Sequence, residues 1–288
     1  MRYFLAVTLI ILVCTGCERQ AAIPAKPIVL VSVPPYLYFA KRIAGDTVTL
    51  LTLVPPGTNP HIYEPTPKQV QAFRKAALWI RLGEPAEQKI YQVLKEQCPQ
   101  MQIADVTQGV PLLALCDHCD QDAHPVHTEE GKDLHIWLSP KWAQTQAQTI
   151  AQHLSALLPE HRERYQHALQ LLLDDLKTVE QEIHARLAAR KGHAIVVSHP
   201  AFAYFCQDYG LKQLSIESEG KDPLPQQIAS LLKRAKEEQI ALVIAEPQYS
   251  DKGALRIAEC LHVPLHTIDP YAEAYLDNVK HIAEVLGK

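Results

Sequence analysis

The hydrophobic and polar positions of this chain follow two alternating patterns. Short apolar runs have the length of strands, and between them lie segments such as 34–45 and 84–97, in which apolar residues recur at helical spacing. This alternation predicts parallel sheet covered by helices. Eight runs have the strand pattern: 28–33, 47–54, 77–83, 102–106, 194–198, 211–217, 241–247 and 264–269.

One long amphipathic segment, residues 158–191, separates the first four runs from the last four. It carries Leu and Val at helical spacing among many charges, with Gly192 just past its end. About thirty helical residues would extend about 45 Å, more than one lobe needs. We therefore predict an α/β fold with an N-terminal lobe at 28–157 and a C-terminal lobe at 192–288. Each lobe is a parallel sheet covered by helices, and a rigid helix at 158–191 links them. The alternative is a long helix that belongs to one lobe only.

The first 17 residues have the pattern of an export signal. Arg2 precedes an apolar run, 3–13, that is too short to span a bilayer. Thr-Gly-Cys at 15–17 resembles a bacterial lipobox. We predict a protein exported to the periplasm or cell surface, lipidated at Cys17, with 18–27 as a tether and the lipid as its only membrane contact. Cleavage without lipidation is the alternative.

Charge argues against one class of partner. The chain has a formal net charge of −4 and no stripe of basic residues. We therefore expect no nucleic-acid partner, and we expect a monomer.

Four metal-competent side chains lie at comparable places near the ends of predicted strands or loops. His61 follows the second run through a turn, and His135 follows a polar loop. Beyond the long segment, His199 follows the fifth run directly and Asp269 ends the eighth. Ligands of open parallel sheets gather beyond the carboxyl ends of strands, and small ligands often bind between lobes. We predict one metal site in the cleft between the lobes, with two ligands from each.

This donor set indicates the kind of metal. Three neutral imidazoles and one carboxylate suit tetrahedral Zn²⁺ better than the oxygen-ligated Ca²⁺ or Mg²⁺, while Mn²⁺ and Fe²⁺ remain alternatives. Four protein ligands close a zinc site, whereas catalytic zinc keeps one position open for water. We therefore expect binding rather than enzymatic catalysis. The rivals are a secreted zinc hydrolase, for which the chain offers no H-E-x-x-H helix, and an adhesin or scaffold with a structural metal.

Four stretches around these residues resemble the signature segments of a known family. They are VPPGTNPHIYEPTP, DLHIWLSP, VVSHPAFAYFCQDYGL and TIDPYAEAYLDN. In order and spacing they are similar to the metal-binding substrate-binding proteins of ABC transporters, the ZnuA/TroA-like family. The resemblance runs from residue 28 to the end and implies delivery of the bound metal to an ABC importer permease. It implies that His61, His135 and His199 are the imidazole ligands and that Asp269 is the carboxylate. Manganese-type members tend to have Glu in place of His199, which favours zinc.

The resemblance also implies a second place where metal gathers. Zinc-type members often carry a loop rich in His and acidic residues where this chain has a short polar loop before His135. A solvated loop without a metal role and a local disulfide are the alternatives. The metal-competent residues of this loop are Cys116, His118, Cys119, His124 and His127.

The remaining cysteines and three glutamates complete the expectations. Zinc-type relatives have a disulfide at positions similar to Cys206 and Cys260, so the resemblance implies that bridge, with free core thiols as the alternative. Cys98 is then expected as a buried small apolar residue. A ligating His usually donates its other ring N–H to a carboxylate or carbonyl. The candidates for that role are Glu64, Glu217 and Glu246.

Overall fold

The computed structural model describes residues 26–114, 131–216 and 225–288. Cys17 with the export signal, most of the tether, and Glu217 lie outside these ranges, so their roles stay predictions. The same holds for the loop residues Cys116, His118, Cys119, His124 and His127.

The N-terminal sheet consists of four parallel strands in the order β2-β1-β3-β4. Its central strands are continuously apolar because helices cover both faces of the sheet. The strands are β1 (Ile28–Val31), β2 (Thr49–Thr52), β3 (Ala76–Arg81) and β4 (Gln102–Asp105). The crossover helices are α1 (Pro35–Ala44), α2 (Pro67–Phe73) and α3 (Pro85–Gln97).

Proline begins each of these helices, where its missing N–H costs no hydrogen bond. Helix α2 also has a capping box between Thr66 and Gln69, which fixes where the chain turns after the loop that carries His61.

The C-terminal sheet repeats this topology with the order β6-β5-β7-β8. In both sheets the register of the central pair shifts after the first paired residue, at Ile28/Val29 and at Ala194/Ile195. In this strand order the chain reverses direction across the sheet between β1 and β3, and again between β5 and β7. Ligands bind beyond the carboxyl ends of such pairs. The elements are β5 (Ala194–Val197), α6 (Ala203–Tyr209), β6 (Lys212–Ser215), α7 (Pro225–Glu237), β7 (Ile240–Ala245), α8 (Lys252–Leu261), β8 (Leu265–Thr267) and α9 (Tyr275–Leu286).

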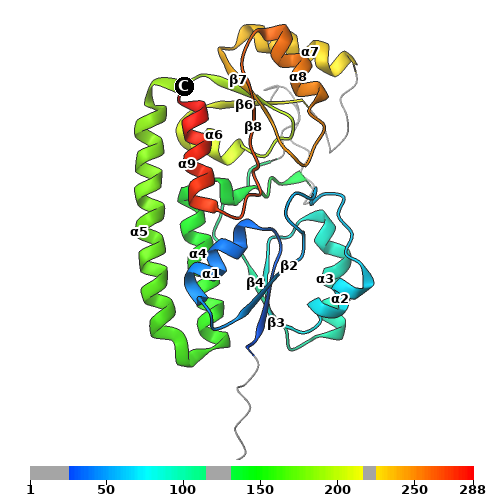
Figure 1. Ribbon diagram of the computed structural model, residues 1–288, viewed down its shortest axis with the longest axis vertical. Coiled ribbons are helices and arrows are strands. Elements are labelled where there is room, and N and C mark those ends of the chain that lie inside the picture. The colour runs from blue at the N-terminus through cyan, green and yellow to red at the C-terminus, as the bar shows by residue number, and fades with distance from the viewer. Residues whose placement is uncertain (1–25, 115–130, 217–224) are drawn as a thin grey trace, which may run out of the picture.

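The predicted α/β fold with two parallel sheets and a long joining helix is confirmed. Between the sheets the chain forms η2 (Ile136–Leu138), α4 (Pro140–Leu157), η3 (Pro159–His161), α5 (Arg162–Leu187) and η4 (Ala188–Arg190). Figure 1 shows α5 running along both lobes, and it packs on α4 and α1 as well as on α9. Its buried stripe has the three- and four-residue spacing seen in the sequence: Tyr165, Leu169, Leu172, Leu176, Val179, Ile183 and Leu187.

One hydrophobic core extends through both lobes. It joins the N-terminal sheet, α4 and α5 to the inner face of the C-terminal sheet, α6 and α9. The ring of Tyr275, on α9, lies 4.7 Å from the ring of Phe39, on α1. A second, smaller core fills the outer face of the C-terminal sheet beneath α7 and α8. Because the larger core is shared, a large separation of the lobes would expose apolar surface.

The predicted Cys206–Cys260 disulfide is wrong for this structure, in which both cysteines are free. Cys206 is buried on α6 in the shared core, with Ile195 and Ile244. Cys260 is exposed on α8, whose Ile257 packs in the second core. The two helices therefore cover opposite faces of the C-terminal sheet, and the sheet lies between the two sulfur atoms.

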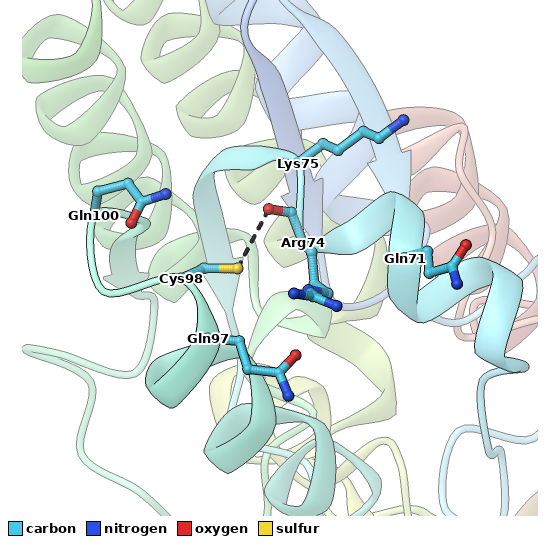
Figure 2. Close-up of a pocket in the computed structure, with 6 residues that line it drawn as sticks. All are labelled: Gln71, Arg74, Lys75, Gln97, Cys98 and Gln100. Carbon is cyan, nitrogen blue, oxygen red and sulfur yellow. Dashed lines mark hydrogen bonds between the residues drawn. The ribbon is translucent and has the colours of Figure 1, made fainter.

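Cys98 is buried as predicted, and its thiol donates to the backbone carbonyl of Arg74 at 3.3 Å. It lines a surface hollow at the amino-terminal edge of the sheet, where the chain enters β3 and β4, away from the strand ends that carry the histidines. Figure 2 shows the lining residues Gln71, Arg74, Lys75, Gln97, Cys98 and Gln100. Among the described residues, no helix is both long and apolar enough to span a membrane.

Candidate metal centre

Three histidines from distant parts of the chain converge between the two sheets. Nε2 of His199 lies 3.1 Å from Nε2 of His61 and 3.2 Å from Nε2 of His135. Two nitrogens that bind one ion at about 2.0–2.1 Å in tetrahedral geometry are about 3.4 Å apart. The observed spacings are close to that value. In the described part of the chain, this trio has potential ligand atoms within 4.8 Å of one another.

His61 is held by the loop that follows β2. Its backbone N–H donates to Oδ1 of Asn59 at 2.9 Å, a local turn of the kind Asn favours. Its Nδ1 lies 3.4 Å from Oε2 of Glu84, which follows β3 and is almost fully buried. The side chain of His61 is 24% exposed, so it is the most accessible member of the trio.

His135 is held more tightly, just before η2. Oδ1 of Asp133 accepts both the backbone N–H of His135, at 2.8 Å, and the Nδ1 side of its ring, at 2.7 Å. The backbone carbonyl of Asp133 in turn accepts the hydroxyl of Tyr204, on α6. The segment that carries His135 is thus fixed from the C-terminal lobe, and the His135 side chain is only 2% exposed.

His199 follows β5 and is 5% exposed. Its backbone N–H donates to Oε2 of Glu246, the residue after β7, at 3.2 Å. Its imidazole stacks on the ring of Tyr249, with centroids 4.5 Å apart and planes 9° from parallel. The carboxyl ends of two neighbouring strands therefore set both the backbone and the ring orientation of His199.

Burial keeps the imidazoles of His61 and His199 neutral. It lowers the pKa of His61 from 6.5 to about 3, with a smaller contribution from His135. Burial also lowers the pKa of His199 well below its usual value, and the neighbouring His135 and His61 add to the effect. A neutral imidazole offers a lone pair to a metal, so His61 and His199 can bind a cation at neutral pH without losing a proton.

Buried carboxylates surround the trio. Glu84 is 2% and Asp133 is 1% exposed. Within the described part of the chain, Oε1 of Glu84 and Oδ2 of Asp133 have no hydrogen-bond partner. Burial, opposed by His135, raises the pKa of Glu84 from 4.5 to about 7. Buried negative charge without a partner is costly, so a cation among the three imidazoles would be stabilised here.

The structure does not bring Asp269 into the trio. Its Oδ1 accepts the amide of Gln248 at 2.7 Å and the backbone N–H of Tyr271 at 2.8 Å. The side chain that reaches the histidines from this turn is Tyr271, whose hydroxyl oxygen lies 3.0 Å from Nε2 of His135.

Of the two described glutamates predicted to support the ligands, Glu246 lies beside His199 and accepts its backbone N–H. Glu64 is wrong for this role, because it is exposed and pairs with Lys89 at 2.8 Å. Sequence reasoning missed Glu84 and Asp133. The pattern that indicated His199, a polar residue directly after an apolar run, also applies to Glu84, which directly follows the third run, 77–83.

The sequence matches one family model over residues 29–288, and that model is described as ZnuA, the periplasmic component A of a zinc-uptake complex. The chain belongs to this family. A solved structure of ZnuA superimposes with a TM-score of 0.81 at 34% sequence identity, covering 91% of this chain and 98% of that one.

Two further relatives of this chain are named for metal binding. A putative metal-binding protein of Chlamydia muridarum is 30% identical over 262 residues, which cover 91% of each chain. The zinc-binding lipoprotein AdcA of Streptococcus pneumoniae strain R6 is 27% identical over 272 residues, or 92% of this chain. This chain spans 54% of the length of AdcA.

Proposed function

We propose that this protein captures Zn²⁺ outside the cytoplasm with His61, His135 and His199 and delivers it to the permease of an ABC importer. The observation that carries the proposal is the convergence of three Nε2 atoms, at 3.1 and 3.2 Å along the trio, from both sides of the long helix. Membership of the ZnuA family supports the transport role. No catalytic step is needed.

Zinc is favoured over other cargo by the donors. Three imidazoles supply nitrogen ligands of borderline softness, and the carboxylates Glu84 and Asp133 stand behind His61 and His135 rather than among the ligands. The zinc named in the family description and in AdcA supports the same choice. The alternative within the same role is Mn²⁺ or Fe²⁺.

Asp269 stays the predicted fourth ligand. To reach the ion, its carboxylate would exchange the amide of Gln248 for the metal. The ion would enter past His61, because His135 and His199 are almost fully enclosed. Export, lipidation of Cys17 and a monomeric state belong to the same proposal. Mass spectrometry of the N-terminal peptide of protein isolated from membranes would test whether Cys17 carries a lipid.

Metal content decides the main proposal. The protein is stripped with a chelator, dialysed against equal Zn²⁺, Mn²⁺ and Fe²⁺ under anaerobic conditions, and analysed for bound elements. We expect zinc in preference to the others, its loss in His199→Ala, and its retention in the control His281→Ala, an exposed position on α9. A His199→Ala variant that retains as much zinc as the parent would exclude the trio as the site.

Two further measurements separate cargo from structural metal and test the loop. Circular dichroism of the stripped protein should equal that of the loaded protein, since a transport site empties without unfolding. A variant lacking residues 116–127 should bind fewer zinc ions than the parent if the loop binds metal, and the same number if it does not.

A further inference from the structure

Tyr271 makes a contact with the metal trio that the proposed function does not explain. Its hydroxyl oxygen is 3.0 Å from Nε2 of His135. On the other side of that ring, Nδ1 lies 2.7 Å from Oδ1 of Asp133, which also accepts the backbone N–H of His135. Nδ1 donates to this carboxylate, so in the neutral ring of His135 the proton is on Nδ1 and the lone pair is on Nε2. In this tautomer the Tyr271 O–H donates to Nε2.

The lone pair that accepts this hydrogen bond is the one that a metal would use. Nε2 of His135 faces Nε2 of His199 at 3.2 Å, which is the spacing of two ligands of one ion. One lone pair cannot accept the hydroxyl proton and bind a metal together. Binding of the ion at His135 must break the hydrogen bond from Tyr271.

The position of the hydroxyl is built into the fold. The ring of Tyr271 is buried and packs against Trp137, with centroids 5.1 Å apart. The indole N–H of Trp137 donates to the carbonyl of Pro270 at 2.8 Å, and the backbone N–H of Tyr271 is fixed by Asp269. The turn 269–271 comes from the C-terminal half of the chain and is thus tied to the segment that carries His135.

We propose that Tyr271 limits the affinity of the metal site, because its hydroxyl competes with the ion for Nε2 of His135. The inference rests on the proposed function. In the metal-free protein the hydroxyl satisfies a buried lone pair, which lowers the free energy of the empty site relative to the loaded one. When the ion leaves, the hydrogen bond re-forms. A carrier that must release its cargo benefits from such a partner.

The test compares Zn²⁺ affinities by competition with a chromophoric chelator. Tyr271→Phe retains the ring and removes the hydroxyl, so we expect it to bind Zn²⁺ about fivefold more tightly than the parent, the equivalent of one hydrogen bond of about 1 kcal/mol. The control is Tyr275→Phe, whose buried hydroxyl has no hydrogen-bond partner in the described part of the chain, and its affinity should equal the parent's. Co²⁺ absorption should be the same in the parent and Tyr271→Phe, since the hydroxyl is not a ligand.

Equal or weaker Zn²⁺ binding by Tyr271→Phe would overturn the inference. Weaker binding with an altered Co²⁺ spectrum would instead make Tyr271 a ligand. If neither the parent nor Tyr275→Phe binds Zn²⁺, the proposed function fails. If the parent binds Zn²⁺ but Tyr271→Phe does not bind it more tightly, only the inference about Tyr271 fails.

Discussion

Nδ1 of His135 lies 2.7 Å from Oδ1 of Asp133, and both side chains are almost fully buried. A carboxylate in this position fixes the tautomer of the imidazole, orients the ring, and raises the basicity of the opposite nitrogen. The buried charge also favours a cation beyond the ring. The contact therefore contributes to metal affinity although Asp133 is not itself proposed as a ligand.

Replacing Asp133 by Asn should weaken Zn²⁺ binding by about 10- to 100-fold, the usual effect of losing such a partner. The amide keeps the shape but loses the charge and one acceptor oxygen. Competition with a chromophoric chelator measures the change. The matched control is Asp174→Asn, an exposed position on α5, which should leave the affinity unchanged. A loss of less than about threefold in Asp133→Asn would mean that His135 does not depend on this contact.

The structure brings the three predicted histidines together. The strand-end argument accounts for His61 and His199, which follow β2 and β5, because parallel sheets bring the carboxyl ends of their strands together, whereas His135 follows a loop. It could not give side-chain directions in loops. Glu64 is only three residues from His61, yet it points to solvent and pairs with Lys89. Asp269 lies two residues beyond the end of β8, and its Oδ1 accepts the backbone N–H of Tyr271 in its own turn. A local hydrogen bond competes with metal binding for the same side chain, and the sequence patterns do not indicate which of the two prevails.

The topology of the C-terminal sheet explains why the predicted Cys206–Cys260 disulfide does not form in this structure. From the centre of the C-terminal sheet, the connection from β5 to β6 and the one from β7 to β8 run in opposite directions. Right-handed crossovers then place α6 and α8, with Cys206 and Cys260, on opposite faces. The order of the strands, which the sequence alone did not provide, decides this.

The stacked ring of Tyr249 should matter to zinc binding through His199. The two rings are 4.5 Å apart and nearly parallel, and such pairs are worth about 0.5–1.5 kcal/mol. We expect Tyr249→Leu to bind Zn²⁺ about 2- to 10-fold more weakly than Tyr249→Phe, which keeps the stacked ring. The comparison isolates the ring from the hydroxyl. Equal affinities of the two variants would show that stacking does not hold His199 in place.

The buried Glu87 should make the stability of the metal-free protein depend on pH. Burial raises the pKa of Glu87 from 4.5 to about 7, although the Gly83 N–H, Arg81 and the hydroxyl of Ser32 oppose the shift. Between these two values the folded state holds a proton that the unfolded state has released. This group therefore contributes most stability below pH 4.5, and the contribution is lost as the pH rises through 7.

Replacing Glu87 by Gln removes this contribution. The unfolding free energy of the variant minus that of the parent should increase by between about 2 and 3 kcal/mol from pH 5 to pH 8. Urea unfolding of both proteins in chelator at the two pH values measures the difference. Glu96→Gln, an exposed position on the same helix, is the control and should show no such gain. A gain below about 0.5 kcal/mol would contradict a raised pKa at Glu87.

The shared core predicts that both lobes unfold together. Leu176 is fully buried on α5, the helix that packs on α1 and α4 as well as on α9. Leu176→Ala should lower the unfolding free energy by about 2–5 kcal/mol, the usual cost of a cavity at a buried Leu. Leu171, on the same helix, is 51% exposed, so Leu171→Ala should change stability by about 0.5 kcal/mol or less.

The transition should remain single in the parent and in both variants. The three tryptophans, Trp79 on β3, Trp137 on η2 and Trp142 on α4, all precede α5 in the chain, so tryptophan fluorescence reports the N-terminal lobe and the segment between the sheets. Far-ultraviolet circular dichroism reports the helices of both lobes. Because one core joins the lobes, loss of packing at Leu176 should shift both signals by the same amount. Separate midpoints for the two signals in Leu176→Ala would show that the lobes unfold independently and that α5 belongs to one of them alone.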